Sequence, residues 1–185
     1  EELKVTEINS GIYAFDNKLL FDYLPLLKND NAQKEYYITD LIEIFKEHGH
    51  TVKAVPIADK DEASGINDRY ELYFAQKWLQ RKINYAWMRN GVTIIDPEST
   101  YISDDAVIGT DTIIYPETFI YGHSKIGKYN LISGGCYIEN SVTGDHCTVT
   151  HADLIDSEMD DHKKIGPYLR IENNHISDSW HAVEG

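Results

Sequence analysis

Residues 102–138 read ISDDAV-IGTDTI-IYPETF-IYGHSK-IGKYNL-ISGGCY-I, and an isoleucine returns at every sixth position of this stretch. The seven isoleucines are Ile102, Ile108, Ile114, Ile120, Ile126, Ile132 and Ile138. A six-residue period fits neither an α-helix nor a simple strand, and it is typical of a hexapeptide-repeat parallel β-helix. We expect each side of a three-sided coil to point one isoleucine inward, about 4.8 Å from its equivalent in the next coil.

Small or short polar residues follow these isoleucines by four positions, where such a coil must turn a corner without a steric clash. They are Ala106, Thr112, Thr118, Ser124, Asn130 and Cys136. After Ile138 we predict that the inward position moves one residue early to Thr143 and continues through Val149 and Ile155. It is then predicted to slip again, to Met159, Ile165 and Ile171. Residues 172–185 contain no convincing hexad and no obvious cap for the last apolar layer, so they are predicted to form an irregular tail.

The composition is that of an ordinary globular protein, with 42% apolar and 26% charged residues among 185. Because 31 acidic residues outnumber 17 basic ones, the net charge is −14. That balance argues against nucleic acid or an anionic membrane as a partner, since phosphate binding needs clustered Lys and Arg. The sequence shows no long apolar run and no signal-like start, so we expect a cytoplasmic protein without a membrane span.

The two cysteines do not make a disulfide framework. Cys136 lies at the small corner position after Ile132, and Cys147 lies at the same position after Thr143. We interpret both as small buried hydrophobic residues in a reducing compartment, and not as catalytic thiols.

Residues 1–66 lack the six-residue period and are predicted to be an α/β segment. Asp16 and Asn17 can cap a short helix that runs to Leu27. A second helix is expected to place Leu41, Ile42, Ile44 and Phe45 on one face and to end at Gly49. Residues 51–57 alternate like a strand.

Residues 67–91 are predicted to form a helical arm that joins this segment to the β-helix. Asn67 or Asp68 can open the helix, and Gly91 ends it. The expected buried stripe consists of Leu72, Ala75, Leu79 and Ile83. The β-helix is then predicted to span residues 92–171.

Five stretches of this chain resemble a known family. They are EINSGIY at 7–13, NDNAQKEYY at 29–37, GINDR at 65–69, MRNGVTIIDP at 88–97 and IGPY at 165–168. The family is the bacterial bifunctional enzyme that joins N-acetylglucosamine-1-phosphate uridyltransferase to glucosamine-1-phosphate N-acetyltransferase. The resemblance runs almost continuously from residue 1 to about residue 170, and 88–97 is its most specific part.

The resemblance implies a Rossmann-like uridyltransferase domain, a helical arm and a left-handed β-helix that forms a homotrimer. Such left-handed coils are an exception to the usual right-handed crossover. It implies that Asn9 contacts the sugar nucleotide and that Asn67 coordinates Mg²⁺, where an amide oxygen can complete a shell of phosphate oxygens. Asn9 and Asn67 can equally be a strand-end residue and a helix cap. The reaction would acetylate glucosamine-1-phosphate from acetyl-CoA and then transfer uridylyl from UTP to give UDP-N-acetylglucosamine.

The chain also departs from the family pattern. The family's glycine-rich nucleotide loop, its lysine and its metal-binding aspartate have no equivalent in this sequence. Arg170 is a candidate substrate contact, but it lies two positions before the family's arginine, whose place is taken by Glu172. His175 and His181 do not stand in the context of the catalytic histidine. We therefore expect this chain alone to catalyse neither reaction, and we identify no catalytic residue in it.

Three alternatives remain open from the sequence. His123, His146, His151 and His162 could serve a zinc enzyme like the β-helical carbonic anhydrases, which would need three imidazoles and an open position. The chain could instead be a non-catalytic trimerising module. It could also belong to other sugar-nucleotide pyrophosphorylases with β-helical tails, although the stretch at 88–97 argues against them.

Overall fold

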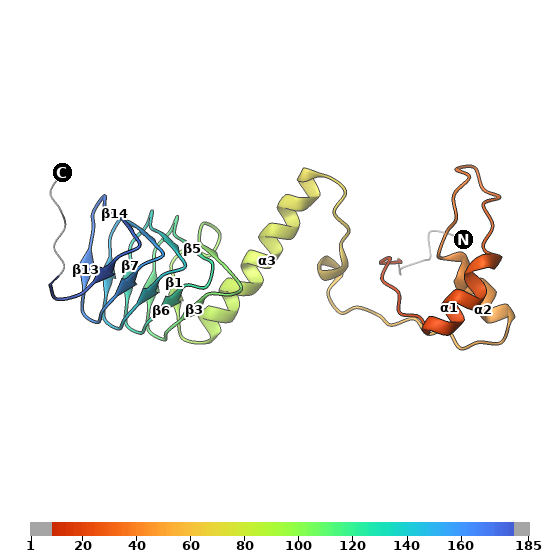
Figure 1. The fold of residues 1–185 in the computed structure, drawn as a ribbon, viewed down its shortest axis with the longest axis horizontal. Coiled ribbons are helices and arrows are strands. Elements are labelled where there is room, and N and C mark those ends of the chain that lie inside the picture. The colour runs from red at the N-terminus through yellow and green to blue at the C-terminus, as the bar shows by residue number, and fades with distance from the viewer. Residues whose placement is uncertain (1–8, 180–185) are drawn as a thin grey trace. The chain divides into compact units, whose positions relative to one another are not determined.

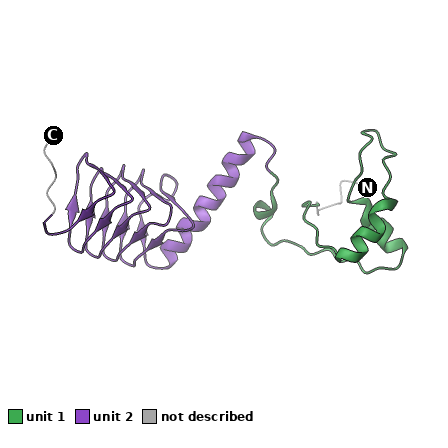
Figure 2. Ribbon diagram, viewed as in Figure 1, with its two compact units in different colours: residues 1–65 green, residues 66–185 purple. Residues whose placement is uncertain are grey.

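The structure is a computed structural model that describes residues 9–179 (Figure 1). It divides into two compact units, one up to Gly65 and one from Ile66 onward, which Figure 2 shows in different colours. Among the described residues, no helix combines the length and the apolar character that crossing a membrane requires.

The first unit is helical. It contains α1 (Asn17–Tyr23), the 3-10 turn η2 (Leu24–Leu26), α2 (Asp40–Glu47) and the 3-10 turn η3 (Lys60–Ala63). The predicted cap of α1 is confirmed, because the Asp16 carboxylate accepts a hydrogen bond from the backbone N–H of Leu19 at 3.0 Å. The α-helix ends four residues before Leu27, at the turn that contains Pro25. Gly49 has a φ of +75° just beyond α2, as its predicted role as a helix stop requires.

The α/β prediction for this unit is only partly met. The part of the unit that the structure describes contains helices, and the predicted strand at 51–57 does not form. A strand needs a neighbour for its backbone hydrogen bonds, which local alternation cannot supply. Val55 in this segment is 82% exposed. Within residues 9–65 the buried apolar side chains are Leu41 and Phe45, so this unit has a very small core.

The second unit begins with α3 (Arg69–Arg89). Asp68 caps the helix by accepting a hydrogen bond from the backbone N–H of Glu71 at 2.8 Å, so the predicted start is confirmed at Asp68. Gly91, with a φ of +91°, follows the helix end as predicted.

The predicted buried stripe of α3 is wrong at two of its four positions, whereas Ala75 and Ile83 are partly buried. Leu72 and Leu79 are 50% and 47% exposed, whereas Gln80 and Asn84 are buried. The reason is that α3 packs on β1 and β2 of the β-helix. The helix face there meets backbone carbonyl oxygens of the loop between these strands, which accept hydrogen bonds from amide side chains. Ile83 and Trp87 pack against the edge of the apolar core.

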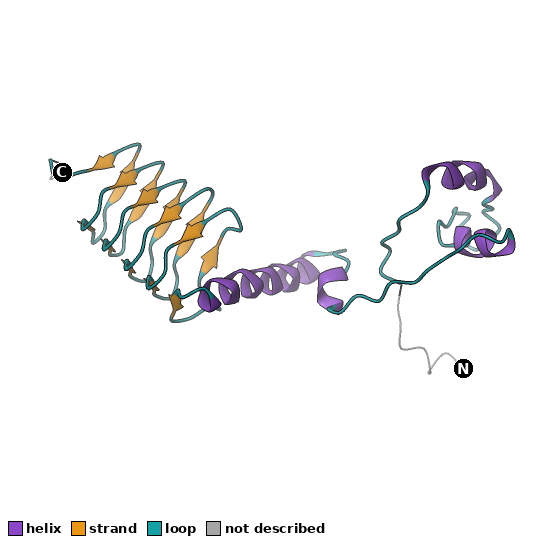
Figure 3. Cartoon of the chain, turned by 90° about the horizontal axis from the view of Figure 1, so that it is seen from below, coloured by secondary structure: helices purple, strands orange, loops and turns teal. Residues whose placement is uncertain are grey.

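Residues 93–176 form a parallel β-helix whose strands stack in three sheets (Figure 3). Sheet A contains β1 (Thr93–Ile94), β4 (Ile113–Ile114), β7 (Leu131–Ile132), β10 (Thr148–Val149) and β13 (Lys164–Ile165). Sheet B contains β2 (Tyr101–Ile102), β5 (Phe119–Tyr121), β8 (Tyr137–Glu139), β11 (Asp153–Ile155) and β14 (Arg170–Glu172). Sheet C contains β3 (Val107–Ile108), β6 (Lys125–Ile126), β9 (Val142–Thr143), β12 (Glu158–Met159) and β15 (His175–Ile176).

All seven isoleucines of the repeat are buried and form three inward ladders, as the period predicts. In sheet B, for example, Ile102 pairs with Ile120 and Ile120 pairs with Ile138. The small corner residues are buried as well, and some of them bond adjacent coils. The Thr112 hydroxyl donates to the carbonyl oxygen of Gly127 at 2.9 Å.

The predicted inward residue Ile155 is wrong, because Leu154 takes its place. Leu154 is fully buried and pairs with Ile138 and Ile171, whereas Ile155 faces outward beside Glu139. The side after Val149 is one residue shorter than a hexad, and a one-residue slip moves a side chain to the other face of a strand. The other inward residues predicted after Ile138 are confirmed.

The β-helix also continues beyond Ile171. Strand β15 lies inside the segment predicted to be an irregular tail, and Ile176 is buried as the next member of the sheet C ladder. The corner before it is turned by Asn173 at a φ of +50°, and the corresponding corners of the two preceding coils use Asn140 and Asp156 at +47° and +46°. At each of these corners the two flanking inward residues are one position closer than in a full hexad. Counting in steps of six therefore assigns the wrong inward residue after such a corner.

Candidate functional site

The outer face of sheet B carries the most organised set of exposed side chains. Because the central residue of each strand points inward, its neighbours on both sides point outward. The first outward row contains Tyr101, Phe119, Tyr137, Asp153 and Arg170. The second outward row contains Tyr121, Glu139, Ile155 and Glu172. Equivalent positions in successive coils thus form continuous rows along the sheet.

Aromatic rings occupy the first three positions of the first row. The rings of Tyr101 and Phe119 stack with centroids 5.3 Å apart and an interplanar angle of 6°. The ring of Tyr137 is 6.5 Å from Phe119 and tilted by 39°, so the stack opens between these two coils. Tyr121 of the second row meets Tyr137 edge-on at 5.8 Å. Such offset and edge-on pairs are favourable ring arrangements.

Charged groups continue both rows. The Tyr137 hydroxyl donates to Oε2 of Glu139 at 2.8 Å, and this hydrogen bond raises the pKa of Tyr137. The Arg170 guanidinium lies 2.5 Å from a carboxylate oxygen of Glu172 and 3.8 Å from one of Asp153. The hydrogen bond to Glu172 is the main cause that raises the pKa of Arg170.

A groove of about 690 Å³ runs along this face. It is lined by Glu117, Phe119, Gly135, Cys136, Tyr137, Glu139, Asp153, Ile155 and Arg170. This volume lies within the range of small-molecule sites in proteins. The predicted substrate contact Arg170 therefore lies in a groove, although whether it contacts a substrate stays a prediction.

The two predicted asparagines lie in different units. Asn9 is exposed, and its Oδ1 accepts a hydrogen bond from the backbone N–H of Gly11 at 3.0 Å. Asn67 is exposed immediately before α3, where its backbone N–H donates to a carboxylate oxygen of Glu71 at 2.6 Å. The helix cap is Asp68 and not Asn67. The ligand roles of both asparagines stay predictions.

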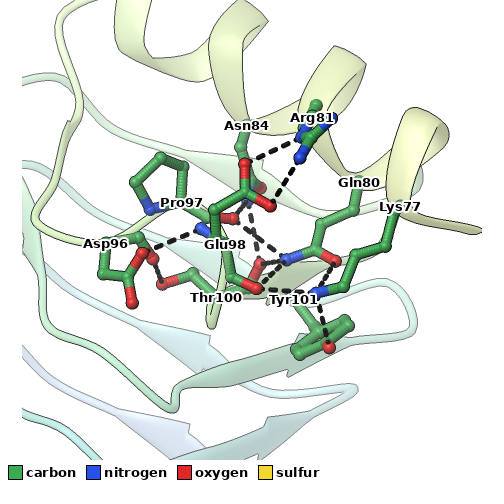
Figure 4. Close-up of polar contacts among 9 residues, drawn as sticks. All are labelled: Lys77, Gln80, Arg81, Asn84, Asp96, Pro97, Glu98, Thr100 and Tyr101. Atoms are coloured by element: carbon green, nitrogen blue, oxygen red, sulfur yellow. Dashed lines mark hydrogen bonds and ion pairs between the residues drawn. The ribbon is translucent and has the colours of Figure 1, made fainter.

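A polar junction between α3 and the β-helix was missed by the sequence analysis (Figure 4). The buried amides of Gln80 and Asn84 both donate to the carbonyl oxygens of Pro97 and Thr100, at 2.8 to 3.0 Å. At the exposed rim, Nε of Arg81 lies 2.8 Å from Oε1 of Glu98, and this hydrogen bond lowers the pKa of Glu98. The signal in the sequence is the spacing of two amide residues by one helical turn, at the end of the helix that precedes the β-helix.

The histidines proposed for a zinc alternative do not gather in one chain. His146 and His162 stack face to face, with ring centroids 4.9 Å apart and an interplanar angle of 4°, on the corner that also carries Tyr129. His123 lies 3.9 Å from a carboxylate oxygen of Asp105, on an exposed turn. Across residues 9–179 no group of three or more His, Cys, Asp or Glu side chains is arranged to hold a metal ion.

Both cysteines lie inside the β-helix, as their corner positions predict. Cys136 is fully buried and Cys147 is 1% exposed, and both are free thiols. Burial raises the pKa of each thiol, which keeps them protonated and unreactive.

The strands form three parallel sheets, and each side of every coil buries one residue. This arrangement defines the chain as a hexapeptide-repeat β-helix protein. The comparisons with curated proteins then identify the chain as a homologue of the bifunctional protein GlmU. It is 42% identical over 176 residues to GlmU of Exiguobacterium sibiricum, covering 95% of this chain and 39% of that protein. It is 48% identical over 171 residues to GlmU of Pediococcus pentosaceus, covering 92% and 37%.

The chain spans about two fifths of the length of the curated relatives that it matches. No family model matches it. Among solved structures, the acetyltransferase domain of PglB from Neisseria gonorrhoeae covers 56% of this chain and 61% of its own, at 10% identity and a TM-score of 0.25. A perosamine N-acetyltransferase from Caulobacter crescentus covers 56% and 63%, at 12% identity and a TM-score of 0.28. The parallel register of the strands in three sheets defines the β-helix by itself.

Proposed function

We propose that this chain is part of a bifunctional transferase that makes UDP-N-acetylglucosamine. One activity would transfer the acetyl group of acetyl-CoA to glucosamine-1-phosphate, and the other would transfer uridylyl from UTP to the product. The observation that carries the proposal is the identity of 42–48% to GlmU proteins over 92–95% of the chain. That match includes both α3 and the β-helix, so it is not confined to the repeat.

For the uridylyl transfer, we propose that Asn9 contacts the sugar nucleotide and that Asn67 supplies one oxygen ligand to Mg²⁺. The exposed position of both side chains is compatible with ligand binding. When bound, Mg²⁺ would neutralise phosphate charge during the in-line displacement. An amide ligand suits this task, because phosphate oxygens already bring negative charge to the ion. The Rossmann-like character of the first unit belongs to this proposal.

For the acetyl transfer, we propose that the β-helix is left-handed and assembles as a homotrimer. The outward rows of sheet B and the Arg170 guanidinium would lie near substrate. The supporting observation is a regular β-helix whose outer face holds a groove of small-molecule size. The proposed location is cytoplasmic.

A second candidate function is that of a non-catalytic trimerising module. It is favoured by the pairing of Arg170 with Glu172 at 2.5 Å, which occupies the guanidinium that would otherwise meet an anionic substrate. The expectation that this chain alone catalyses neither reaction stays a prediction.

The two halves of the proposal can be tested separately. Acetyl transfer and uridylyl transfer would be assayed on the protein purified from its full reading frame, with the 185-residue chain in parallel. In the full protein, Asn67→Ala should lower uridylyl transfer by about ten- to a hundredfold and leave acetyl transfer unchanged, as expected for a metal ligand. The matched control is Asn17→Ala, which alters another exposed asparagine at the start of a helix.

Two results would contradict the proposal. A full protein with neither activity would favour the trimerising module, which sedimentation analysis would then detect as a stable trimer. A loss of both activities to the same extent in Asn67→Ala would show that Asn67 supports the fold and does not bind the metal.

A further inference from the structure

The outer face of sheet A differs from the other two faces in its lack of charge. Among the described residues, those that point outward from the first four strands of sheet A are all uncharged. The first outward row contains Thr93, Ile113, Leu131 and Thr148, and a charge follows only at Lys164 in the fifth strand. The second outward row contains Ile95, Tyr115, Ser133 and Thr150. Ile95 and Tyr115 are 54% and 41% exposed, so apolar surface faces solvent here.

The other two faces carry charge within their first four strands. Sheet B points Glu139 and Asp153 outward, and sheet C points Lys125 and Glu158 outward. Because the chain has a net charge of −14, two copies of it repel each other wherever their carboxylates meet. Of the three faces, sheet A is therefore the one at which two copies can meet without bringing like charges together.

Exposed rings line both edges of this uncharged face. The corner before sheet A carries Tyr129, His146 and His162, whose ring centroids are 4.8 and 4.9 Å apart in one stack. The corner after sheet A carries His151 and Tyr168, with ring centroids 6.0 Å apart. Tyr129 and Tyr168 are 54% and 86% exposed. Tyrosine is enriched and charge is depleted in protein–protein interfaces, and sheet A with its two corners has both properties.

The spacing of the rows on sheet A fits a second copy of this chain. Equivalent residues repeat once per coil, at about 4.8 Å along the stack of strands. A partner with an irregular surface could match only a few of these rows, whereas a second copy has rows of the same spacing and can match them coil for coil. A contact through sheet A also leaves sheet B free, where the groove lies.

We propose that the outer face of sheet A is the surface through which copies of this chain associate, with Ile113, Tyr115 and Leu131 at the centre of the contact. Removal of these side chains from water supplies the driving force. The assignment rests on the proposed assembly of the β-helix, to which it adds the face and the residues. It does not depend on either transfer reaction.

Sedimentation analysis of the 185-residue chain over a range of concentrations tests this assignment. We expect a concentration-dependent oligomer. Ile113→Glu should weaken the association by at least about a hundredfold, because its carboxylate would be buried in the contact without a partner. Val107→Glu is the matched control, since it places the same charge at the outward position of β3 in sheet C, and it should leave the association unchanged. Circular dichroism of both variants checks that the β-helix is retained.

Cysteine labelling tests the same face without adding charge to it. Thr148→Cys places a thiol on sheet A, and Lys125→Cys places one on sheet C. Because both native thiols are buried, the introduced thiol is the one that reacts. Thr148→Cys should react at least about tenfold more slowly at concentrations where the oligomer forms than in the dilute chain, in proportion to the associated fraction. Lys125→Cys should react at the same rate throughout.

Three results would overturn the assignment. They are a chain that stays monomeric at all concentrations, a folded Ile113→Glu protein that associates as the wild type does, and Thr148→Cys labelling that does not slow on association. Neither sedimentation nor labelling involves acetyl or uridylyl transfer, so a protein without either activity can still confirm that the copies meet at sheet A.

Discussion

The side-chain amide nitrogen of Asn84 on α3 lies 2.8 Å from the carbonyl oxygen of Thr100 in the first turn of the β-helix. Gln80, one helical turn earlier, donates to the same oxygen at 2.8 Å. Both amides also reach the carbonyl oxygen of Pro97. Two carbonyl groups of one loop therefore each accept two amide donors from one helix, and this doubled contact fixes α3 on the end of the β-helix (Figure 4).

This redundancy predicts a strongly non-additive double mutant. Gln80→Ala or Asn84→Ala alone should cost about 1 kcal/mol in the free energy of unfolding, because each carbonyl keeps one donor. The double variant should exceed the sum by about 1–2 kcal/mol, since the carbonyl oxygens of Pro97 and Thr100 then lose both amide donors. Urea unfolding followed by circular dichroism measures all three, and Gln76→Ala on the exposed face serves as control. Additive effects would show that the two amides act independently.

The shortened coil predicts opposite consequences at two adjacent aliphatic residues. Leu154→Ala should destabilise the protein by about 2–5 kcal/mol, because it leaves a cavity in a fully buried ladder. Ile155→Ala should cost about 1 kcal/mol or less, since its side chain faces outward. The unfolding midpoints of the two variants compare the two registers directly. A larger loss of stability for Ile155→Ala than for Leu154→Ala would show that Ile155, and not Leu154, points into the core.

The buried thiols predict resistance to modification. Burial raises the pKa of Cys136 and Cys147, so neither should react with a thiol reagent at neutral pH until the protein unfolds. In denaturant, the same reagent should detect two reactive thiols per chain. The equivalent position one coil later holds Ala152, so Cys136→Ala should keep the fold at a cost of about 1 kcal/mol. Rapid reaction of either thiol in the folded protein would contradict this burial.

The last coil predicts a pH-dependent contribution from His175. Its Nε2 lies 2.8 Å from a carboxylate oxygen of Asp160, and this hydrogen bond, with the charges of Asp160 and Glu158, raises the pKa of His175 above 6.5. The contact of the protonated imidazole with Asp160 stabilises the folded state fully below pH 6.5. This stabilisation is lost as the pH rises through the raised pKa of His175 in the folded protein. Wild type should therefore melt above His175→Asn at pH 6, and the two should converge by about pH 8.

The partner residue supplies the control for this prediction. Asp160→Asn should remove the same pH-dependent part of the melting temperature, because it removes the hydrogen bond and the charge that act on the imidazole. A difference between wild type and His175→Asn that is constant from pH 6 to pH 8 would show that the ion pair does not contribute.

The candidate site was only partly accessible from the sequence. Arg170 was singled out through a resemblance, and the structure places it in a groove of sheet B. The rows of Phe119, Tyr137 and Asp153 were not predicted, because these residues are 16 to 18 positions apart and meet only through the pairing of successive coils. Their separation in the sequence predicts that they are neighbours on the sheet only when the number of residues in each coil is known.

The β-helix from Ile102 to Ile138 was determined by the sequence itself. Each coil buries the same kind of side chain at the same place, so a local period is enough to define the core. The tertiary structure decided what depends on exact coil length and on contacts between distant segments: the inward turn of Leu154, the added strand at Ile176 and the amide junction of α3. The six-residue period reveals the inward residue that every side of the coil shares. A corner that is shorter by one residue changes which residue of the next strand points inward, and this is seen only from the residue with which that strand pairs.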